Sequence, residues 1–498
     1  MSKKVFFLWS VKGVLLLWLF SVLYYLVSYR EQLIIGKSAV FALIVVAVAV
    51  VILLIIDFLR SIDLQFNSMV VGCSILVAIY CIEAVHLAIF YYPGFPEYSP
   101  PITLDASLIK LAESSDVMLD KRTGFEVVRD YRSRGIDAYP AFMVNGRQEW
   151  GEKSIRDGQI WPLGGHSNKL IVHCNESGYW SIYNSDEKGF NNPPGSWELA
   201  AKEKADYLLL GDSFVHGACV GENEDYGAIL RSYAKHVINL GQRGNGPLLN
   251  LAGLIEYGIE IKPSKVLWFY TEGNDLINLR AEAQNPLVSK YLLDGFSQGL
   301  STRVEEVDDI VNKMTNEHWA RIDELEQTKY SAMLKYWATL RSIRKRFGLE
   351  LPRKGDEGVE KLKRAISLLE AGESNLDVDR SDRGKRQREA ELEDQYTLEI
   401  DIFREILLKA KNIANTWGAE IVFVYMPSGN RFLDKLNSPG SLKKIVVEMV
   451  SSTGIRVIDL VPAFNALTDP MGAFPFRRGG HYNSTGYAIS GAYLFKNL

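Results

Sequence analysis

The sequence contains few of the residues from which metal sites and disulfide frameworks are built. Its 498 residues include four cysteines and seven histidines, which lie far apart along the chain, and no Cys-x-x-Cys pair occurs. Because the spacing of a metal site is missing, we expect no metal and no cofactor. Cys174 and Cys219 could pair if this part of the chain lies outside the cytoplasm, but their spacing alone does not show that they are close.

An excess of positive charge is also missing. The formal net charge is −4, and basic residues are mostly interspersed with acidic ones. The basic run at residues 341–346 is too short to indicate a phosphate-binding face. We therefore expect no nucleic-acid partner.

Long apolar runs are present near the N-terminus. Residues 5–29, 38–56 and 68–92 contain only Lys12 and Glu83 as charged residues. Each run is long enough to cross about 30 Å of hydrocarbon at about 1.5 Å per residue. No small-residue cleavage site follows the first run, so we interpret it as an anchor and not as a signal peptide. The sequence thus predicts a membrane-embedded region of three transmembrane helices within residues 1–92.

The basic residues around these runs give the orientation. Lys3 and Lys4 favour a cytoplasmic N-terminus, and Arg60 agrees, whereas Arg30 and Lys37 argue against it. We favour the cytoplasmic N-terminus. Three spans would then place the rest of the chain outside the cytoplasm, in the periplasm for a multi-pass protein of the bacterial inner membrane; the opposite orientation would leave it in the cytosol.

The region that follows the membrane segment, residues 93–204, is rich in aromatic residues and turns. Residues 169–174 and 179–183 read as short strands, and the sequence Asn-Glu-Ser-Gly between them predicts a β-hairpin. We expect an accessory region that can line a pocket.

Strand and helix patterns alternate in residues 205–498, which indicates an α/β fold with a parallel sheet and helices on both faces. A charged, helix-favouring segment at residues 301–417 interrupts the alternation. We interpret it as a solvent-facing helical insertion; a cap over the pocket and a docking arm for a partner are the alternatives. Strands are predicted at residues 207–210, 236–240, 266–270, 421–425 and 457–460, and helices at 225–234, 248–257 and 485–495.

The first of these strands runs into Gly211-Asp212-Ser213. This places the serine at a sharp strand-to-helix turn, where the N-terminus of the helix can stabilise an oxyanion. A serine hydroxyl needs a neutral imidazole to take its proton, and His481 is the best candidate. Asp212 is expected to hold the turn, and the same three residues also suit an ordinary turn.

Three further segments follow this motif in order, and with it they resemble the four blocks of the SGNH hydrolases, also called GDSL-type esterases. The resemblance covers about residues 206–498 and implies a flavodoxin-like, three-layer αβα fold. The three segments are Asn239-Leu-Gly-Gln-Arg-Gly244, Gly273-Asn274-Asp275 and Gly480-His481-Tyr-Asn.

The resemblance assigns a role to each matching residue. Ser213 is the implied nucleophile and His481 the implied base. The oxyanion-hole donors that it implies are the amides of Ser213 and Gly244 and the side chain of Asn274.

One position departs from the family pattern. Most members carry an aspartate three residues before the histidine, where it orients the imidazole; this chain has Arg478 there. Either a substitute orients His481, or the enzyme is slow, or the site no longer hydrolyses; a backbone carbonyl, Asp459 or Asp469 could be that substitute, and the sequence does not choose among them.

The resemblance implies an ester hydrolase, or an O-acyltransferase with the same covalent chemistry. The expected substrates are acyl esters, foremost acetyl esters, of envelope carbohydrate or glycolipid, and the expected context is the polysaccharide machinery of the envelope. The alternative, suggested by Arg478, is a non-catalytic polysaccharide-binding or assembly protein with a degenerate site.

Overall fold

The computed structural model describes residues 3–28, 47–48, 50–51, 62–86, 118–142, 160–234, 236–340, 344, 382–433, 440–478 and 480–498. The chain forms two compact units. The N-terminal unit comprises Met1–Tyr98 and Asp323–Asp379, and the α/β unit comprises Ser99–Ile322 and Arg380–Leu498. The regions expected at residues 93–204 and 205–498 therefore contribute to the same compact unit.

Two helices of the N-terminal unit are long and apolar enough to cross a membrane, judged by length and composition. They are α1 (Lys3–Ser28) and α3 (Ile62–His86), with apolar windows at Val5–Val22 and Leu64–Ala84. The described residues thus contain two such helices and not the expected three. The remaining predicted span, residues 38–56, lies almost entirely outside the described residues.

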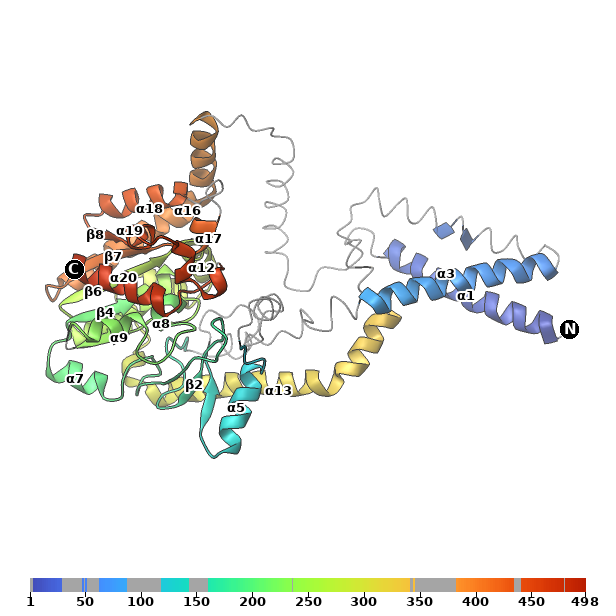
Figure 1. Ribbon diagram of the computed structural model, residues 1–498, viewed down its shortest axis with the longest axis horizontal. Coiled ribbons are helices and arrows are strands. Elements are labelled where there is room, and N and C mark those ends of the chain that lie inside the picture. The colour runs from blue at the N-terminus through green and yellow to red at the C-terminus, as the bar shows by residue number, and fades with distance from the viewer. Residues whose placement is uncertain are drawn as a thin grey trace. The chain divides into compact units, whose positions relative to one another are not determined.

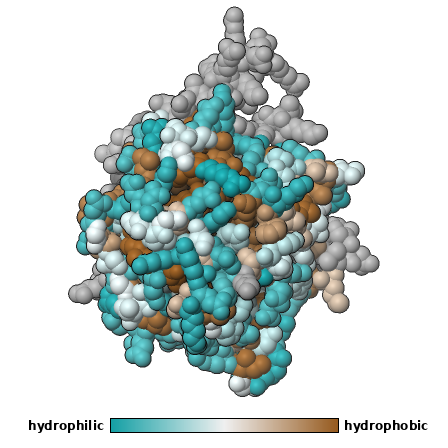
Figure 2. Space-filling view, turned by 90° about the vertical axis from the view of Figure 1, so that its left-hand side faces the viewer, coloured by the Kyte–Doolittle hydropathy of each residue, from teal (hydrophilic) through white to brown (hydrophobic). Residues whose placement is uncertain are grey.

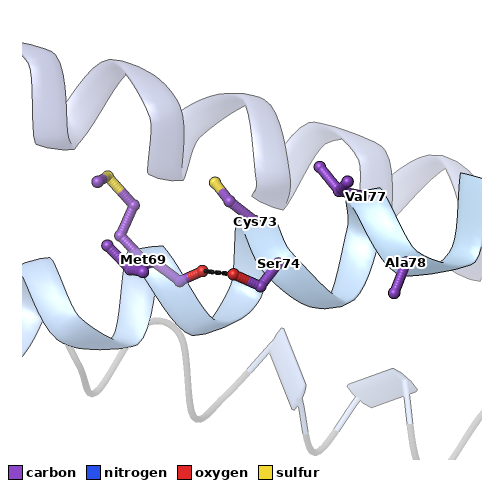
Figure 3. Close-up of a pocket in the computed structure, with 6 residues that line it drawn as sticks. Met69, Cys73, Ser74, Val77 and Ala78 are labelled. Carbon is purple, nitrogen blue, oxygen red and sulfur yellow. Dashed lines mark hydrogen bonds between the residues drawn. The ribbon is translucent and has the colours of Figure 1, made fainter. Parts of the chain in front are cut away.

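Helices α1 and α3 contact each other, and they cross in the view of Figure 1. The Lys12 ammonium of α1 donates a hydrogen bond of 3.4 Å to the side-chain oxygen of Gln65 on α3, so a charged group is paired inside this apolar contact. One face of α3 carries a hollow, and its side chains recur three or four residues apart (Figure 3). This hollow is lined by Met69, Val70, Cys73, Ser74, Val77 and Ala78.

The long helix α13 (Val304–Ala338) ends in the N-terminal unit against α3. The indole nitrogen of Trp337 donates to the Tyr80 carbonyl at 3.0 Å, and the Tyr80 hydroxyl donates to the Ala338 carbonyl at 3.2 Å. The two aromatic rings also contact each other, with centroids 5.0 Å apart. Residues 80 and 337 are thereby linked although they are far apart in sequence.

A five-stranded parallel sheet forms the centre of the α/β unit, as predicted. Its spatial order is β5-β4-β6-β7-β8, so the first strand in sequence pairs with both the second and the third. This 2-1-3-4-5 order is that of flavodoxin-like folds, in which ligands bind at the carboxyl ends of the strands beside the point where the order reverses. The strands are β4 (Tyr207–Leu210), β5 (Val237–Asn239), β6 (Lys265–Thr271), β7 (Glu420–Met426) and β8 (Arg456–Asp459).

Helices cover both faces of the sheet, which gives three layers (Figure 1). Side chains of a strand alternate between the two faces, and in β6 Trp268 and Phe269 accordingly belong to different core clusters. One face is covered by α10 (Pro247–Gly253), η2 (Leu254–Gly258), α11 (Ile259–Ile261), α12 (Asp275–Ala283), η3 (Val288–Leu292), η4 (Leu300–Thr302), the first turns of α13, α16 (Asp382–Asn415) and α18 (Gly440–Ser452). The other is covered by α8 (Ser213–His216), α9 (Tyr226–Arg231), α17 (Asn430–Leu433), α19 (Val461–Asn465), η5 (Pro470–Ala473) and α20 (Ser484–Asn497), and η6 (Pro475–Arg477) follows η5.

The C-terminal half of α16 corrects the interpretation of residues 301–417 as a solvent-facing insertion. Phe403 is fully buried, and its ring contacts Trp268, Tyr270 and Phe423 of the sheet. Ile406, Leu407, Ala410 and Ala414 follow at helical spacing and are also fully buried. This half of α16 is therefore the core helix that connects β6 to β7.

The accessory region forms a small three-stranded sheet of β1 (Ala138–Pro140), β2 (Leu170–Val172) and β3 (Ile182–Asn184). Strands β2 and β3 pair in antiparallel fashion, which confirms the predicted hairpin, and β1 pairs parallel to β2. Helix α5 (Gly124–Ser133) packs on this sheet, and its N-terminus is fixed by a capping box between Thr123 and Glu126. Helix α7 (Ser196–Lys202) leads from the accessory region to β4.

The outer face of the α/β unit seen in Figure 2 is mostly hydrophilic, with apolar residues in small areas between polar ones. Such a mixed surface is usual for a domain in water.

Candidate active site

Ser213 lies at the carboxyl end of β4, as the first residue of α8. The turn before it has room for glycine alone, since a Cβ on Gly211 would lie 2.3 Å from the Cγ2 of Val215. The carboxylate of Asp212 accepts a hydrogen bond of 3.0 Å from the Phe214 amide and so caps the helix. The serine hydroxyl is thereby held at the carboxyl ends of the strands, beside the point where the strand order reverses.

His481 contacts Ser213 directly. Its Nε2 lies 2.7 Å from the serine Oγ, within hydrogen-bond distance. His481 precedes α20, and Asn483, which caps α20, accepts a hydrogen bond of 3.0 Å from the Gly486 amide. The structure therefore brings together the two residues that the sequence motifs single out, 268 residues apart.

A carboxylate that the sequence analysis did not identify completes this chain of hydrogen bonds. Oε1 of Glu176 lies 2.8 Å from Nδ1 of His481, and Oε2 accepts a hydrogen bond of 3.0 Å from the His481 amide. Glu176 lies on the turn between β2 and β3, in the accessory region. With Nδ1 protonated toward Glu176, the neutral imidazole presents the lone pair of Nε2 to Ser213.

The two aspartates expected to orient His481 make other contacts. Asp459 accepts hydrogen bonds from the Lys443 ammonium at 2.5 Å and from the Val461 amide at 3.0 Å. Asp469 pairs with Arg477 at 2.7 Å. Glu176 therefore makes the contact with His481 that was expected of Asp459 or Asp469, because the hairpin brings it to the His481 ring. The two aspartates form ion pairs with Lys443 and Arg477 instead.

A disulfide joins the hairpin to the segment after Ser213. Cys174 and Cys219 are bonded, and their Cα atoms lie 5.1 Å apart. Cys174 is two residues before Glu176, and Cys219 is six residues after Ser213. The pairing that the sequence left open is thus present at the site, and it is the one signal that could have pointed to Glu176.

Glu176 and His481 shift each other's pKa in opposite directions. Burial would raise the pKa of Glu176, but the charge of His481 and its hydrogen bonds outweigh burial and lower this pKa to about 2. Burial would lower the pKa of His481, but the charge of Glu176 and its hydrogen bond raise this pKa above its ordinary value. Glu176 is therefore ionised at neutral pH, and the imidazolium that forms when His481 accepts a proton is stabilised.

Asn274, an implied oxyanion donor, is tied to the turn before Ser213. It follows β6, and its Nδ2 donates to Oδ2 of Asp212 at 2.8 Å. The other oxygen of Asp212 accepts from the Thr271 hydroxyl at 3.0 Å. Asp212 thus orients the Asn274 amide while it caps α8, which confirms that it holds the turn. One of the two Nδ2 protons of Asn274 points to Asp212, and the second proton is the one with which the amide can bind a ligand oxygen.

The loop that carries Gly244, the other implied donor, lies against the same turn. The Gln242 amide donates to the Gly211 carbonyl at 3.2 Å. Gly244 has a φ of +79°, a left-handed conformation that favours glycine. Farther along, the carboxylate of Glu282 accepts hydrogen bonds from the amides of Gly246 and Leu248, the latter at 2.9 Å. The loop is therefore fixed at both ends around Gly244.

His216, one helical turn after Ser213, has a structural contact. It is buried, and its Nε2 lies 2.7 Å from the hydroxyl of Tyr183 on β3. This hydrogen bond joins α8 to the accessory hairpin.

One group of side chains among the described residues has the proximity of a metal site, namely Glu176, Cys219 and His481. The sulfur of Cys219 forms a disulfide with Cys174, and the side chains of Glu176 and His481 are hydrogen-bonded to each other. In this arrangement the group does not fit a metal ion.

Comparisons with known proteins add little to this geometry. No family model and no curated protein matches the sequence. Among solved structures, the chain is similar to a putative lipolytic protein of the G-D-S-L family from Desulfitobacterium hafniense DCB-2, with 10% sequence identity and a TM-score of 0.26. The match covers 59% of this chain and 99% of that one.

Proposed function

We propose that the protein is a serine-dependent ester hydrolase or O-acyltransferase. The observation that carries this proposal is the chain of hydrogen bonds from Glu176 through His481 to Ser213, with distances of 2.8 Å and 2.7 Å. A serine, a histidine and a carboxylate in this order form the arrangement that activates a serine hydroxyl in unrelated hydrolases.

The chemistry follows from these contacts. The Ser213 oxygen attacks the ester carbonyl while Nε2 of His481 takes the hydroxyl proton, and Glu176 stabilises the imidazolium. The negative charge that develops on the carbonyl oxygen is bound by the Ser213 amide, the Gly244 amide and the Asn274 side chain. His481 then gives its proton to the departing alcohol, which leaves an acyl group on Ser213. Water or a sugar hydroxyl accepts this group and closes the cycle.

The substrate class that we propose follows from where the site would lie in the cell. Two helices suited to a membrane, together with a disulfide beside the site, support a location on the outer side of the cytoplasmic membrane, since disulfides persist in oxidising compartments. Acyl esters of envelope carbohydrate or glycolipid, foremost acetyl esters, would be available there.

Against the non-catalytic alternative, Glu176 contacts the His481 ring although Arg478 stands at the usual aspartate position, which supports a working site.

Labelling with a fluorophosphonate tests the proposal, because this probe reacts with activated serines. The full-length protein should be labelled, and both Ser213→Ala and His481→Ala should abolish labelling. Ser232→Ala is the matched control, since Ser232 is an exposed serine of the same unit and should leave labelling unchanged. A folded parent protein that is not labelled would contradict the proposal. Release of acetate from acetylated sugars, with and without a sugar acceptor, would then separate hydrolysis from transfer.

A further inference from the structure

The Cys174–Cys219 disulfide lies directly beside the contact between Glu176 and His481. The sulfur of Cys219 is 4.0 Å from Nδ1 of His481, the atom that Glu176 contacts. Its partner Cys174 begins the turn that carries Glu176, and the Ser181 amide donates to the Cys174 carbonyl at 2.8 Å. The bond therefore joins the carboxylate's own turn to the segment that carries the nucleophile.

The turn has a second link to the same segment. The Ser177 hydroxyl donates to the Cys219 carbonyl at 3.3 Å, one residue after Glu176. The base of the hairpin is attached separately, by Tyr183 to His216 and by a hydrogen bond of 3.3 Å from Arg243 to the His173 carbonyl. Loss of the disulfide would therefore leave the hairpin docked but give its tip more freedom.

The position of the tip matters because Glu176 is a long side chain that must meet two donors at once. Its oxygens accept from the amide and the ring of His481 at 3.0 Å and 2.8 Å. Catalytic groups must be held to within a fraction of an ångström, and a crosslink reduces the number of conformations over which the tip is distributed.

We propose that the Cys174–Cys219 disulfide is a positioning element of the active site: it holds Glu176 against His481, so that reduction of the bond weakens the activation of Ser213. This inference rests on the proposed function and adds a redox requirement to it. The chemical step is a two-electron reduction by a dithiol. The sulfur–sulfur bond takes two electrons and two protons and becomes two thiols, while the dithiol becomes a cyclic disulfide.

The first experiment measures the rate of fluorophosphonate labelling of the full-length protein before and after reduction with dithiothreitol. Intact-mass analysis verifies the reduction, and circular dichroism verifies the fold. We expect reduction to slow labelling by about tenfold or more, a part of the roughly 10⁴-fold cost of removing the orienting aspartate from a serine protease. A Cys174→Ala/Cys219→Ala variant should be equally slow and should not respond to dithiothreitol.

Two further variants show through which residue the bond acts. Glu176→Gln already lacks the carboxylate, so reduction should change its rate by less than about twofold, as expected when two changes remove one interaction. A Cys73→Ala/Cys81→Ala variant is the matched control, because these two cysteines are free and lie on α3; it should respond to dithiothreitol like the parent.

A readout that does not need activity separates this inference from the proposed function. The rate at which diethylpyrocarbonate modifies His481, followed by peptide mass spectrometry across pH, gives the pKa of this histidine. Reduction should lower this pKa, since it withdraws the carboxylate that raises it. If the oxidised protein is not labelled by fluorophosphonate, the proposed function fails, and the titration alone decides the positioning role.

Three results would overturn the inference. The first is an unchanged labelling rate, or an unchanged His481 pKa, after verified reduction. The second is an equal slowing of Glu176→Gln, which would mean that the bond acts through another group. The third is loss of the folded signal on reduction, which would assign the disulfide to the stability of the whole unit.

Discussion

Glu176 and His481 are 305 residues apart in the sequence, yet the carboxylate of one meets both the ring and the backbone amide of the other. The backbone contact fixes the carboxylate independently of the ring, so Glu176 can set the direction in which the imidazole faces. A side chain from the accessory hairpin thus completes a site whose other members lie in helix starts and loops around the parallel sheet.

Replacing the Glu176 carboxylate is expected to reduce activity with little effect on folding. Glu176→Gln keeps the shape but removes the charge that stabilises the imidazolium, so kcat and the labelling rate should fall by about 10²–10⁴-fold. Glu203→Gln is the matched control, because Glu203 contacts His236 at 2.7 Å and precedes β4, whereas Ser213 follows the carboxyl end of that strand. Rates that differ by less than about threefold between the two variants would contradict the role of Glu176.

The pH profile should report the same pair. His481 acts as a base only when it is neutral, so activity should rise with pH through its pKa, which Glu176 holds above the ordinary value. In Glu176→Gln the inflection should move to lower pH, since the interaction that favours the protonated ring is lost. The measurement is kcat/KM against pH for both proteins. An inflection that stays in place, or moves upward, would show that Glu176 does not interact with the titrating group.

Asn274 is expected to stabilise the transition state more than the bound substrate. Asn274→Ala should lower kcat by about 10²–10³-fold with a smaller change in KM, as for other single oxyanion donors. The control is Asn497→Ala, at the end of α20, where the side chain donates only within its own helix among the described contacts. Michaelis–Menten kinetics on one ester substrate would test both. A rise in KM at constant kcat would instead assign Asn274 to substrate binding.

Helix α16 offers a test of the corrected fold. Phe403→Ala should lower the free energy of unfolding by about 3–5 kcal/mol, because it removes a fully buried ring from the face of the sheet. Leu398→Ala on the same helix should change it by less than about 0.5 kcal/mol, since Leu398 is 68% exposed. Chemical denaturation of the two variants would make the comparison. Similar values for both would restore the interpretation of α16 as a solvent-facing insertion.

The sheet was predictable because strands β4 to β7 are mostly buried on both faces and therefore appear as short, nearly continuous apolar runs. The strand predicted at residues 207–210 coincides with β4, and the one at residues 421–425 differs from β7 by one residue at each end. The buried part of α16 was missed because the charged residues around 377–393 dominate the composition of the segment. Its apolar residues from Phe403 onward do recur at helical spacing, so the signal was present in the pattern but not in the average.

The residues of the candidate site also differ in whether the sequence reveals them. Ser213 and His481 stand in short motifs whose order along the chain can be read directly. Glu176 stands in a hairpin turn, where an acidic residue is ordinary, and its proximity to His481 arises only when the hairpin docks against α8 through Tyr183 and the disulfide. Contacts of this range depend on the packing of whole elements and leave no local pattern.

The hairpin also determines which fragments of the chain contain the whole candidate site. A protein cut at the boundary expected near residue 204 would keep Ser213, Gly244, Asn274 and His481, but it would have a single unpaired thiol at Cys219 and no carboxylate beside the imidazole. Asn175 in the same turn further donates to the Asp120 carbonyl at 2.9 Å, so a complete soluble fragment has to begin before residue 120. An inactive shorter fragment would not test the proposed activity, since the cut would separate Glu176 from Ser213 and His481.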